Sequence, residues 1–160
     1  GSVYGIKTEK KVTEKSSLEP ISLYNKVKMV TERIIISFKK IESFIIRPAT
    51  VCGYSKRMRL DVTVNALTYS ALKNGIINVF GGKQVRPNIH IDDMVDAYLL
   101  MLEAPKSKIA GQKFNVGSEN HTVIELAEMV KQEVGKDVKL VVSETNDLRS
   151  YHISSKKIRS

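Results

Sequence analysis

Several features that define common protein classes are scarce in this sequence. Its 160 residues include one cysteine, Cys52, so an internal disulfide is excluded and a reducing compartment is expected. No apolar run is long enough to cross a bilayer, and the first residues do not form a secretory signal. These absences predict a cytoplasmic protein without membrane contact. The length suffices for a hydrophobic core.

Acidic residues are scarce in the first third of the chain, which holds most of the net charge of +9. Residues 1–60 contain 13 lysines and arginines but only 5 acidic residues, whereas the two sets nearly balance over 61–160. A polyanionic partner such as RNA is one explanation. A solvated surface is the other, and we favour it, because the lysines near the start alternate with Glu9 and Glu14 and lack neighbouring aromatic rings for base stacking. We therefore predict no nucleic-acid partner.

Helix and strand signals alternate along the chain. Apolar residues recur with helical spacing over 22–40, 61–75, 92–105 and 122–135. Short β-rich or alternating runs occupy 43–51, 77–80, 88–91, 113–117 and 138–144. This alternation predicts an α/β fold with short connections.

The helix ends carry recognisable signals. We expect Ser22 to begin the first helix, Gly75 to end the second, Asp92 to cap the third, and Thr122 with Glu125 to form a capping box on the fourth, which Gly135 closes. In the third helix Val95, Tyr98, Leu99 and Leu102 are expected to face inward. In the fourth the apolar stripe is Val123, Leu126, Ala127, Val130 and Val134.

The first predicted helix holds a tyrosine and a lysine four positions apart, Tyr24 and Lys28. With 3.6 residues per turn, this spacing puts both side chains on one helix face. A lysine ammonium near a phenol favours the phenolate, and such a phenol can take a proton from a sugar hydroxyl while hydride leaves the same carbon. The spacing alone is short enough to arise by chance, so the pair needs support from its surroundings.

Five segments around this pair occur in a characteristic order. They are SVYG, SLYNKVKMVTERII, RPATVCG, GGKQVRPNIHIDDMVDAYLLMLE and KFNVGSENHTVIELAEMV. Together they resemble the extended short-chain dehydrogenase/reductase family, in particular its NAD-dependent nucleotide-sugar epimerases and dehydratases. The resemblance implies the end of a Rossmann-type parallel sheet over residues 1–52 and a small α/β substrate-binding domain over 53–160, with some later elements returning to the first domain.

The resemblance also implies roles for individual residues. Tyr24 would be the catalytic base and Lys28 would bind the ribose of NAD or NADP, with Pro48 and Ala49 passing the cofactor. The residues matched to the nucleotide-sugar site are Thr50, Asn65, Val79, Phe80, Arg86 and Arg149. Thr50 would face the sugar, Val79 and Phe80 would pass the nucleobase, and Asn65, Arg86 and Arg149 would bind the phosphates or close on the nucleotide. A guanidinium suits a pyrophosphate because it can donate two parallel hydrogen bonds.

One part of the family's pattern is missing. The sequence contains no G-x-G-x-x-G or G-x-x-G-x-x-G run, which in the family holds the pyrophosphate of the dinucleotide. We therefore expect the chain to be the C-terminal part of a longer enzyme and to be inactive by itself. The resemblance further implies a homodimer for the full-length form.

The expected reaction is epimerisation. In the dehydratases that this sequence resembles, acid/base carboxylates commonly lie just before the VYG segment, whereas Ser2 precedes Val3 here. The resemblance therefore implies hydride removal and return at a sugar hydroxyl carbon rather than dehydration. A dehydratase, an NADP-dependent reductase and a non-catalytic binding relative remain open alternatives. Cys52 and His90 are expected to be structural, and no residues are spaced as a zinc site.

Overall fold

The computed structural model describes residues 2–7, 11–135, 137–147 and 150–160. Within them the helices are η1 (Ser2–Tyr4), α1 (Leu23–Ser37), α2 (Thr63–Asn74), α3 (Ile91–Glu103), α4 (Lys106–Ile109), α5 (Val123–Val134) and η2 (Lys157–Arg159). The strands are β1 (Ile45–Pro48), β2 (Thr50–Cys52), β3 (Ile76–Phe80), β4 (Val85–His90), β5 (Lys113–Val116), β6 (Glu119–Thr122) and β7 (Lys139–Ser143). The predicted α/β class is confirmed.

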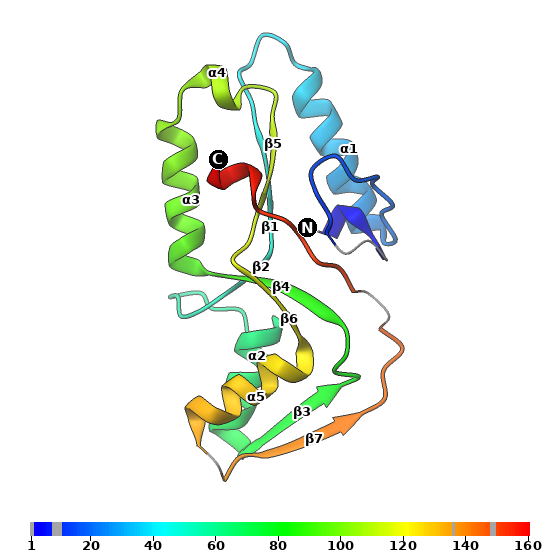
Figure 1. Ribbon diagram of the computed structural model, residues 1–160, viewed down its shortest axis with the longest axis vertical. Helices are drawn as coiled ribbons and strands as arrows, with labels where there is room; N and C mark the ends of the chain where they lie inside the picture. The colour runs from blue at the N-terminus through cyan, green and yellow to red at the C-terminus, as the bar shows by residue number, and fades with distance from the viewer. Residues whose placement is uncertain (1, 8–10, 136, 148–149) are drawn as a thin grey trace.

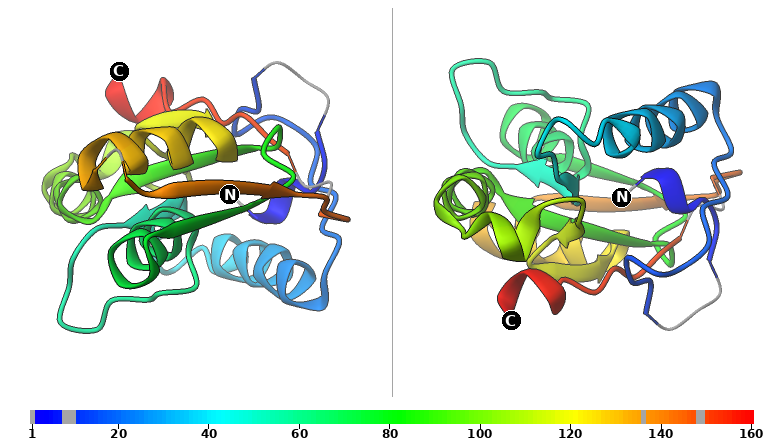
Figure 2. Two further views of the ribbon diagram at one scale, coloured as in Figure 1. Left: turned by 90° about the horizontal axis from the view of Figure 1, so that it is seen from below. Right: turned by 90° about the horizontal axis from the view of Figure 1, so that it is seen from above.

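The strands pair in groups along the long axis of the molecule. β1 pairs in parallel with β5, and β3 pairs in parallel with β7. β4 lies between its parallel neighbour β2 and its antiparallel neighbour β6. In Figure 1 β1 and β5 lie towards one end, β3 and β7 towards the other, and the β2–β4–β6 group lies between them. Figure 2 shows α1 and α2 on one side of the strands and α5 and η2 on the other.

The run predicted as one strand over 43–51 is divided in the structure. β1 ends at Pro48 and β2 begins at Thr50, while Ala49 donates its backbone N–H to the carbonyl of Val116 at 2.7 Å. On one side of this junction the chain pairs with β5, and on the other it pairs with β4. The junction therefore leads the chain from the β1–β5 pair into the middle group of strands.

Each end of the molecule has its own apolar cluster. The first packs α2 and α5 on β3, with Leu67, Ala71, Ile77, Val79, Val123, Leu126, Ala127, Val130 and Val138. The second gathers Ala49, Ile89, Met94, Met101, Phe114, Val116 and Ile153 around β1, β5 and α3. Residues from both the early and the late parts of the chain thus build the cluster next to β1.

Most of the predicted helix ends are confirmed. Ser22 caps α1 by accepting a hydrogen bond from the N–H of Asn25, and Gly75 ends α2 in the left-handed conformation with φ of 63°. Thr122 and Glu125 form the capping box of α5, whose predicted stripe packs in the first cluster, with Val134 partly buried at its end. The sequence patterns did not predict the short elements β6 and α4.

Two predictions for α3 are wrong. Its N-cap is His90, whose Nδ1 accepts from the N–H of Asp92, because the helix begins at Ile91 rather than after Asp92. The expected inward residues Val95, Tyr98, Leu99 and Leu102 are all about half exposed or more, and Met94 and Met101 are buried instead. The helix is apolar on two faces, so hydrophobic periodicity alone cannot say which one packs.

Helix α1 also leaves an apolar stripe uncovered. Leu23, Val27, Val30, Ile34 and Phe38 are exposed, and the buried residues of the helix are the polar Asn25 and Glu32. Within this chain, α1 is therefore held to the rest of the molecule largely by polar contacts.

Candidate active site

The first turns of α1 present the Tyr24/Lys28 pair to solvent. The ring of Tyr24 is 63% exposed, and the ammonium nitrogen of Lys28 lies 5.4 Å from the ring centroid. The Ser22 cap fixes the start of the helix just before Tyr24. The predicted neighbours on one face are thus in contact, and both remain open to a ligand.

The direction of α1 carries the pair towards the junction of β1 and β2. The helix runs opposite to β1 in Figure 1, and Glu32 meets Arg47 of β1 with 2.6 Å between Oε2 and Nη2. A helix rises about 1.5 Å per residue, so Tyr24 lies about 12 Å further along the axis than Glu32. That direction leads past Pro48 to Thr50, a half-buried β2 residue in register with Asn88 of β4.

The loop between β2 and α2 borders this region. Asn65 of α2 is buried and holds the loop in place, since its Oδ1 accepts from the N–H of Gly53 at 3.0 Å and its Nδ2 donates to the carbonyl of Arg59 at 2.9 Å. Asp61 accepts two hydrogen bonds from Arg59 and raises the pKa of that guanidinium, with a smaller contribution from the nearby Tyr24 phenol. The loop therefore lies against the end of β2, within electrostatic reach of Tyr24.

A pocket of about 480 Å³ opens beyond this loop, and its walls include Asp61, Phe80, Arg86 and Asp147. This volume is within the usual range of small-molecule sites. Arg86 is mostly buried, and its Nη2 lies 2.9 Å from Oδ2 of Asp147. The polar residues Thr63, Ser70, Asn78 and Gln84 also line the pocket. The structure thus brings two of the predicted nucleotide contacts, Phe80 and Arg86, to one cavity.

The other predicted substrate residues are placed differently. The side chain of Val79 is wholly buried in the first apolar cluster, so only its backbone could pass a ligand. The hydrogen-bonding atoms of the Asn65 amide serve the loop. Arg149 lies outside the described residues. The roles of Val79, Asn65 and Arg149 as ligand contacts stay predictions.

Asp147 and Gln84 are pocket residues that sequence reasoning missed. Gln84 braces the turn that carries Gly81 and Gly82, because its amide accepts from the N–H of Gly82 at 2.7 Å and donates to the carbonyl of Phe80 at 2.6 Å. The two glycines signalled the turn, but nothing local marked Asp147, which lies 61 positions after Arg86.

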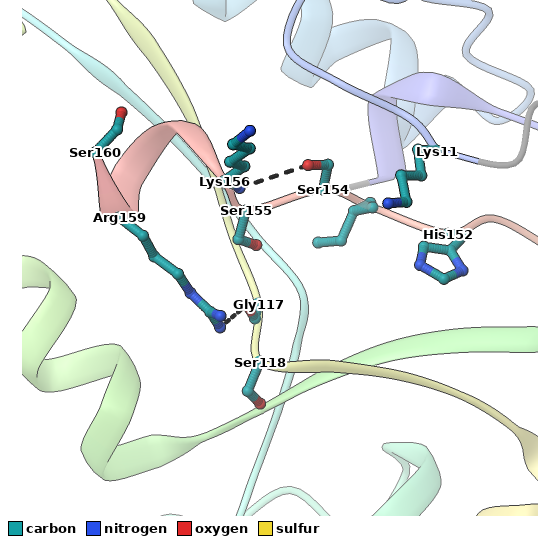
Figure 3. Close-up of a pocket in the computed structure, with 10 residues that line it drawn as sticks. Lys11, Gly117, Ser118, His152, Ser154, Ser155, Lys156, Arg159 and Ser160 are labelled. Atoms are coloured by element: carbon teal, nitrogen blue, oxygen red, sulfur yellow. Dashed lines mark hydrogen bonds between the residues drawn. The ribbon is translucent and has the colours of Figure 1, made fainter.

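A second pocket, of about 370 Å³, lies near the C-terminal segment. It is lined by Lys11, Lys156 and Arg159 among serines and backbone (Figure 3), and by none of the predicted site residues. Cys52 is half-buried with its thiol donating to the carbonyl of Ile89 at 3.4 Å, and burial raises the pKa of that thiol. Neither feature adds a nucleophile to the site.

Within the described ranges, no helix has the length and apolar character needed to span a membrane. Nor do three or more His, Cys, Asp or Glu residues gather in those ranges as candidate ligands of a metal ion.

Known proteins are similar to this chain in sequence and in fold. The model of the NAD dependent epimerase/dehydratase family matches residues 1–117. An uncharacterized UDP-glucose epimerase of Bacillus subtilis, YtcB, is 30% identical over 148 residues, which cover 89% of this chain and 45% of that protein.

Solved structures agree with this match. The UDP-glucose 4-epimerase of Thermotoga maritima, solved with UDP-glucose, has a TM-score of 0.85 at 26% identity, covering 99% of this chain and 53% of its own. The UDP-glucuronic acid 4-epimerase of Bacillus cereus, solved with UDP-glucuronic acid and NAD, has a TM-score of 0.83 at 26% identity, covering 98% of this chain and 51% of its own.

The chain therefore spans about half the length of the relatives it matches. The similarity in structure confirms that the fold belongs with the Rossmann-type epimerases and dehydratases. Because the family model covers well over half of these residues, the chain belongs to the NAD-dependent epimerase/dehydratase family.

Proposed function

We propose that the whole protein is an NAD-dependent epimerase of nucleoside-diphosphate sugars. The observation that carries this proposal is the exposed Tyr24/Lys28 contact at the start of α1. The pocket with Phe80 and Arg86 supports it, because that pocket holds a mostly buried cation beside an exposed aromatic ring. Tyr24 would act as the base, and Arg86 would bind a phosphate.

The residues present fit the nicotinamide end of the cofactor. Tyr24 and Lys28 are exposed side by side, which leaves room for a ribose to hydrogen-bond to the Lys28 ammonium. Pro48 and Ala49 lie at the junction towards which the N-terminal end of α1 is directed, and their backbone would border the ring. Bound there, NAD would supply the acceptor and donor of the hydride at the sugar carbon. Because the glycine-rich turn for the pyrophosphate is not in this sequence, we propose that the 160-residue chain alone has no turnover.

The chain's own part in the reaction is proton transfer and positioning. Tyr24 takes the proton of the sugar hydroxyl as hydride leaves the same carbon, and later returns it to the oxygen. Lys28 stabilises the phenolate form by its positive charge. Return of hydride to the other face of the carbon inverts its configuration, and the overall reaction needs no net oxidant.

The nucleotide would lie in the pocket beyond the loop. Arg86 would bind a phosphate, Phe80 would border the nucleobase, and Thr50 would face the sugar. For Asn65 we propose a role through the loop that it holds, and for Val79 a backbone contact. Arg149 remains the second candidate for the phosphates. Since the epimerases matched above are named for UDP-sugars, we propose a UDP-hexose as the substrate.

The wider organisation is proposed on the same basis. Residues 1–52 would end the NAD-binding domain and 53–160 would form the substrate domain, with β5 and the last segment returning to the first. We propose a homodimer located in the cytoplasm, and the exposed apolar stripe of α1 offers apolar surface for a subunit contact. Light scattering on the whole protein checks the subunit number.

The test is a turnover assay. The whole protein, supplied with NAD, is incubated with UDP-galactose and the mixture is separated by chromatography. We expect UDP-glucose to form and the Tyr24→Phe variant to form almost none. A 4-keto-6-deoxy sugar would indicate a dehydratase, and net consumption of NADPH would indicate a reductase. No reaction with any UDP-hexose would contradict the proposal.

A further inference from the structure

We propose that the buried ion pair between Arg47 and Glu32 positions the Tyr24/Lys28 pair, by fixing the rotation of α1 and by keeping the Glu32 carboxylate away from the Lys28 ammonium. Its effect on catalysis rests on the proposed function, whereas its effect on geometry does not. Arg47 and Glu32 act through other residues and are positioning residues.

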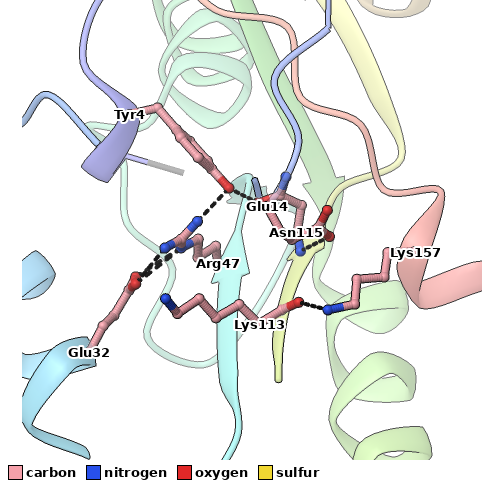
Figure 4. A network of polar contacts seen from close by, with 7 residues as sticks. All are labelled: Tyr4, Glu14, Glu32, Arg47, Lys113, Asn115 and Lys157. Atoms are coloured by element: carbon pink, nitrogen blue, oxygen red, sulfur yellow. Dashed lines mark hydrogen bonds and ion pairs between the residues drawn. The ribbon is translucent and has the colours of Figure 1, made fainter. Parts of the chain in front are cut away.

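The ion pair is the centre of a buried polar network, shown in Figure 4. Arg47 donates from Nε to Glu32 at 3.0 Å and from Nη2 at 2.6 Å, so the contact is two-pronged. Its Nη1 donates to the hydroxyl of Tyr4 at 2.7 Å, and that hydroxyl donates to Oδ1 of Asn115 at 2.6 Å. Arg47, Tyr4 and Asn115 are almost completely buried. Such a fork fixes orientation as well as distance.

The network reaches several distant parts of the chain. Asn115 of β5 donates its amide to the carbonyls of Val12 and Ser154, and its backbone N–H binds the carboxylate of Glu14 at 2.8 Å. Burial opposes the charged form of Arg47, but its contacts with Glu32 and Tyr4 outweigh burial and raise the pKa of the guanidinium. Arg47 is therefore a fixed cation on β1 to which α1 is tied.

Little else sets the rotation of α1. Of its 15 residues, all of them described, only Asn25 and Glu32 are buried, and Met29 is packed partly against the cluster of Val3, Tyr4 and Val12. Most other apolar residues of the helix are exposed, among them Leu23, Val27, Val30 and Ile34. A turn of the helix about its axis would move Tyr24 and Lys28 with it, and the fork on Glu32 opposes that turn.

Glu32 also lies on the same face as the catalytic pair. Tyr24, Lys28 and Glu32 follow at intervals of four, and side chains at this spacing are neighbours on a helix. In the structure Lys28 lies over Tyr24 while Glu32 is bound to Arg47. If Arg47 lost its charge, the Glu32 carboxylate would lose this partner, and Lys28, four residues away, is the cation that α1 itself offers on this face. Arg47 thereby leaves Lys28 available to Tyr24.

The geometric test uses the 160-residue chain and a spectroscopic signature. The ε-methylene protons of Lys28 lie near the Tyr24 ring, so their NMR signal should show an upfield ring-current shift, assigned by its loss in Tyr24→Leu. In Arg47→Gln we expect that shift to fall by about half or more. In the double variant Arg47→Gln/Glu32→Gln, which has no carboxylate to attract Lys28, we expect the shift to return.

Tyr4→Phe is the matched control. It removes a buried hydrogen-bonding group from the same network but leaves the fork between Arg47 and Glu32 intact. It should lower the melting temperature and keep the Lys28 shift. An unchanged Lys28 signal in folded Arg47→Gln would overturn the proposal. If Arg47→Gln does not fold, the test uses Glu32→Gln and the double variant. Both should keep the Lys28 shift, because neither has a carboxylate at position 32 to attract Lys28. Loss of the shift in either variant would overturn the proposal.

The catalytic test uses the whole protein with UDP-galactose. Misplacement of a catalytic group by about 1 Å can cost a hundredfold in rate, so we expect kcat per folded molecule to fall by about tenfold or more in Arg47→Gln. The KM for the sugar nucleotide should stay within about threefold. The double variant has no carboxylate to attract Lys28 but still lacks the fork, so it should recover only part of kcat. A purely structural role predicts activity that follows the folded fraction alone. If the wild type has no turnover, the proposed function fails, and the NMR arm still tests the ion pair.

Discussion

Replacement of Arg86 by alanine should weaken nucleotide binding by an amount that follows from its surroundings. The guanidinium is 14% exposed, lines the pocket and is oriented by Asp147 at 2.9 Å. A hydrogen bond to a charged group contributes about 1.5–3 kcal/mol, so the Kd for UDP should rise about ten- to 150-fold. Stability should change less, because Asp147 is about one third exposed and ion pairs of that exposure contribute about 1 kcal/mol or less.

Calorimetric titration of the whole protein with UDP measures this effect. Arg86→Lys keeps the charge but loses the planar fork, so it should lie between wild type and Arg86→Ala. Arg33→Ala is the matched control, since it removes an exposed arginine of α1 that does not line the pocket. Equal affinity of wild type and Arg86→Ala for UDP would refute the reasoning and leave Arg149 as the remaining candidate for the phosphates.

Three further predictions concern catalysis, the loop and the cap of α5. Tyr24→Phe should lower kcat by about a thousandfold, the range expected for a general base, with UDP affinity nearly unchanged in the same titration. Asn65→Ala should lower the unfolding free energy measured by urea titration by about 1–3 kcal/mol, because two loop hydrogen bonds are lost. In the control Asn74→Ala, which replaces an exposed asparagine of α2, the loss should be about 0.5 kcal/mol or less. The Thr122 N–H holds the pKa of Glu125 below its ordinary value. The stabilisation that this hydrogen bond gives the folded protein is therefore present above the unfolded pKa of about 4.3, and it is lost as the pH falls through the folded pKa. Acid titration of Glu125→Gln should show a smaller loss of melting temperature over that window, and an equal loss would contradict the assignment.

Local signals in the sequence predicted local features of the fold. Ser22, Gly75 and the Thr122/Glu125 box act through groups within a few residues of themselves, and all three lie at helix ends as expected. The α5 stripe was also predictable, because that helix has one apolar face and one polar face. Helix α3 is apolar on both sides, so its packed face depends on the strands against which it folds.

Contacts between distant residues could not be predicted in this way. Arg86 and Asp147 are 61 positions apart in the sequence. Glu32 belongs to helix α1 and Arg47 to strand β1, and the packing of these two elements depends on the whole fold. The family resemblance pointed to Arg86 and Phe80, and the structure adds which acidic residue orients Arg86. It also shows that Val79 is a core residue, which a short β-rich run cannot distinguish from a pocket residue.

The fate of the hydrogen on the epimerised carbon tests the central claim most directly. The whole protein with NAD is given UDP-galactose deuterated at C4 in ordinary water, and the UDP-glucose formed is examined by mass spectrometry and NMR. We expect the product to keep its deuterium at C4, because hydride would be removed and returned within one active site. Tyr24 would exchange only the proton of the hydroxyl group. Product with ordinary hydrogen at C4, or a deoxy sugar in place of UDP-glucose, would contradict it.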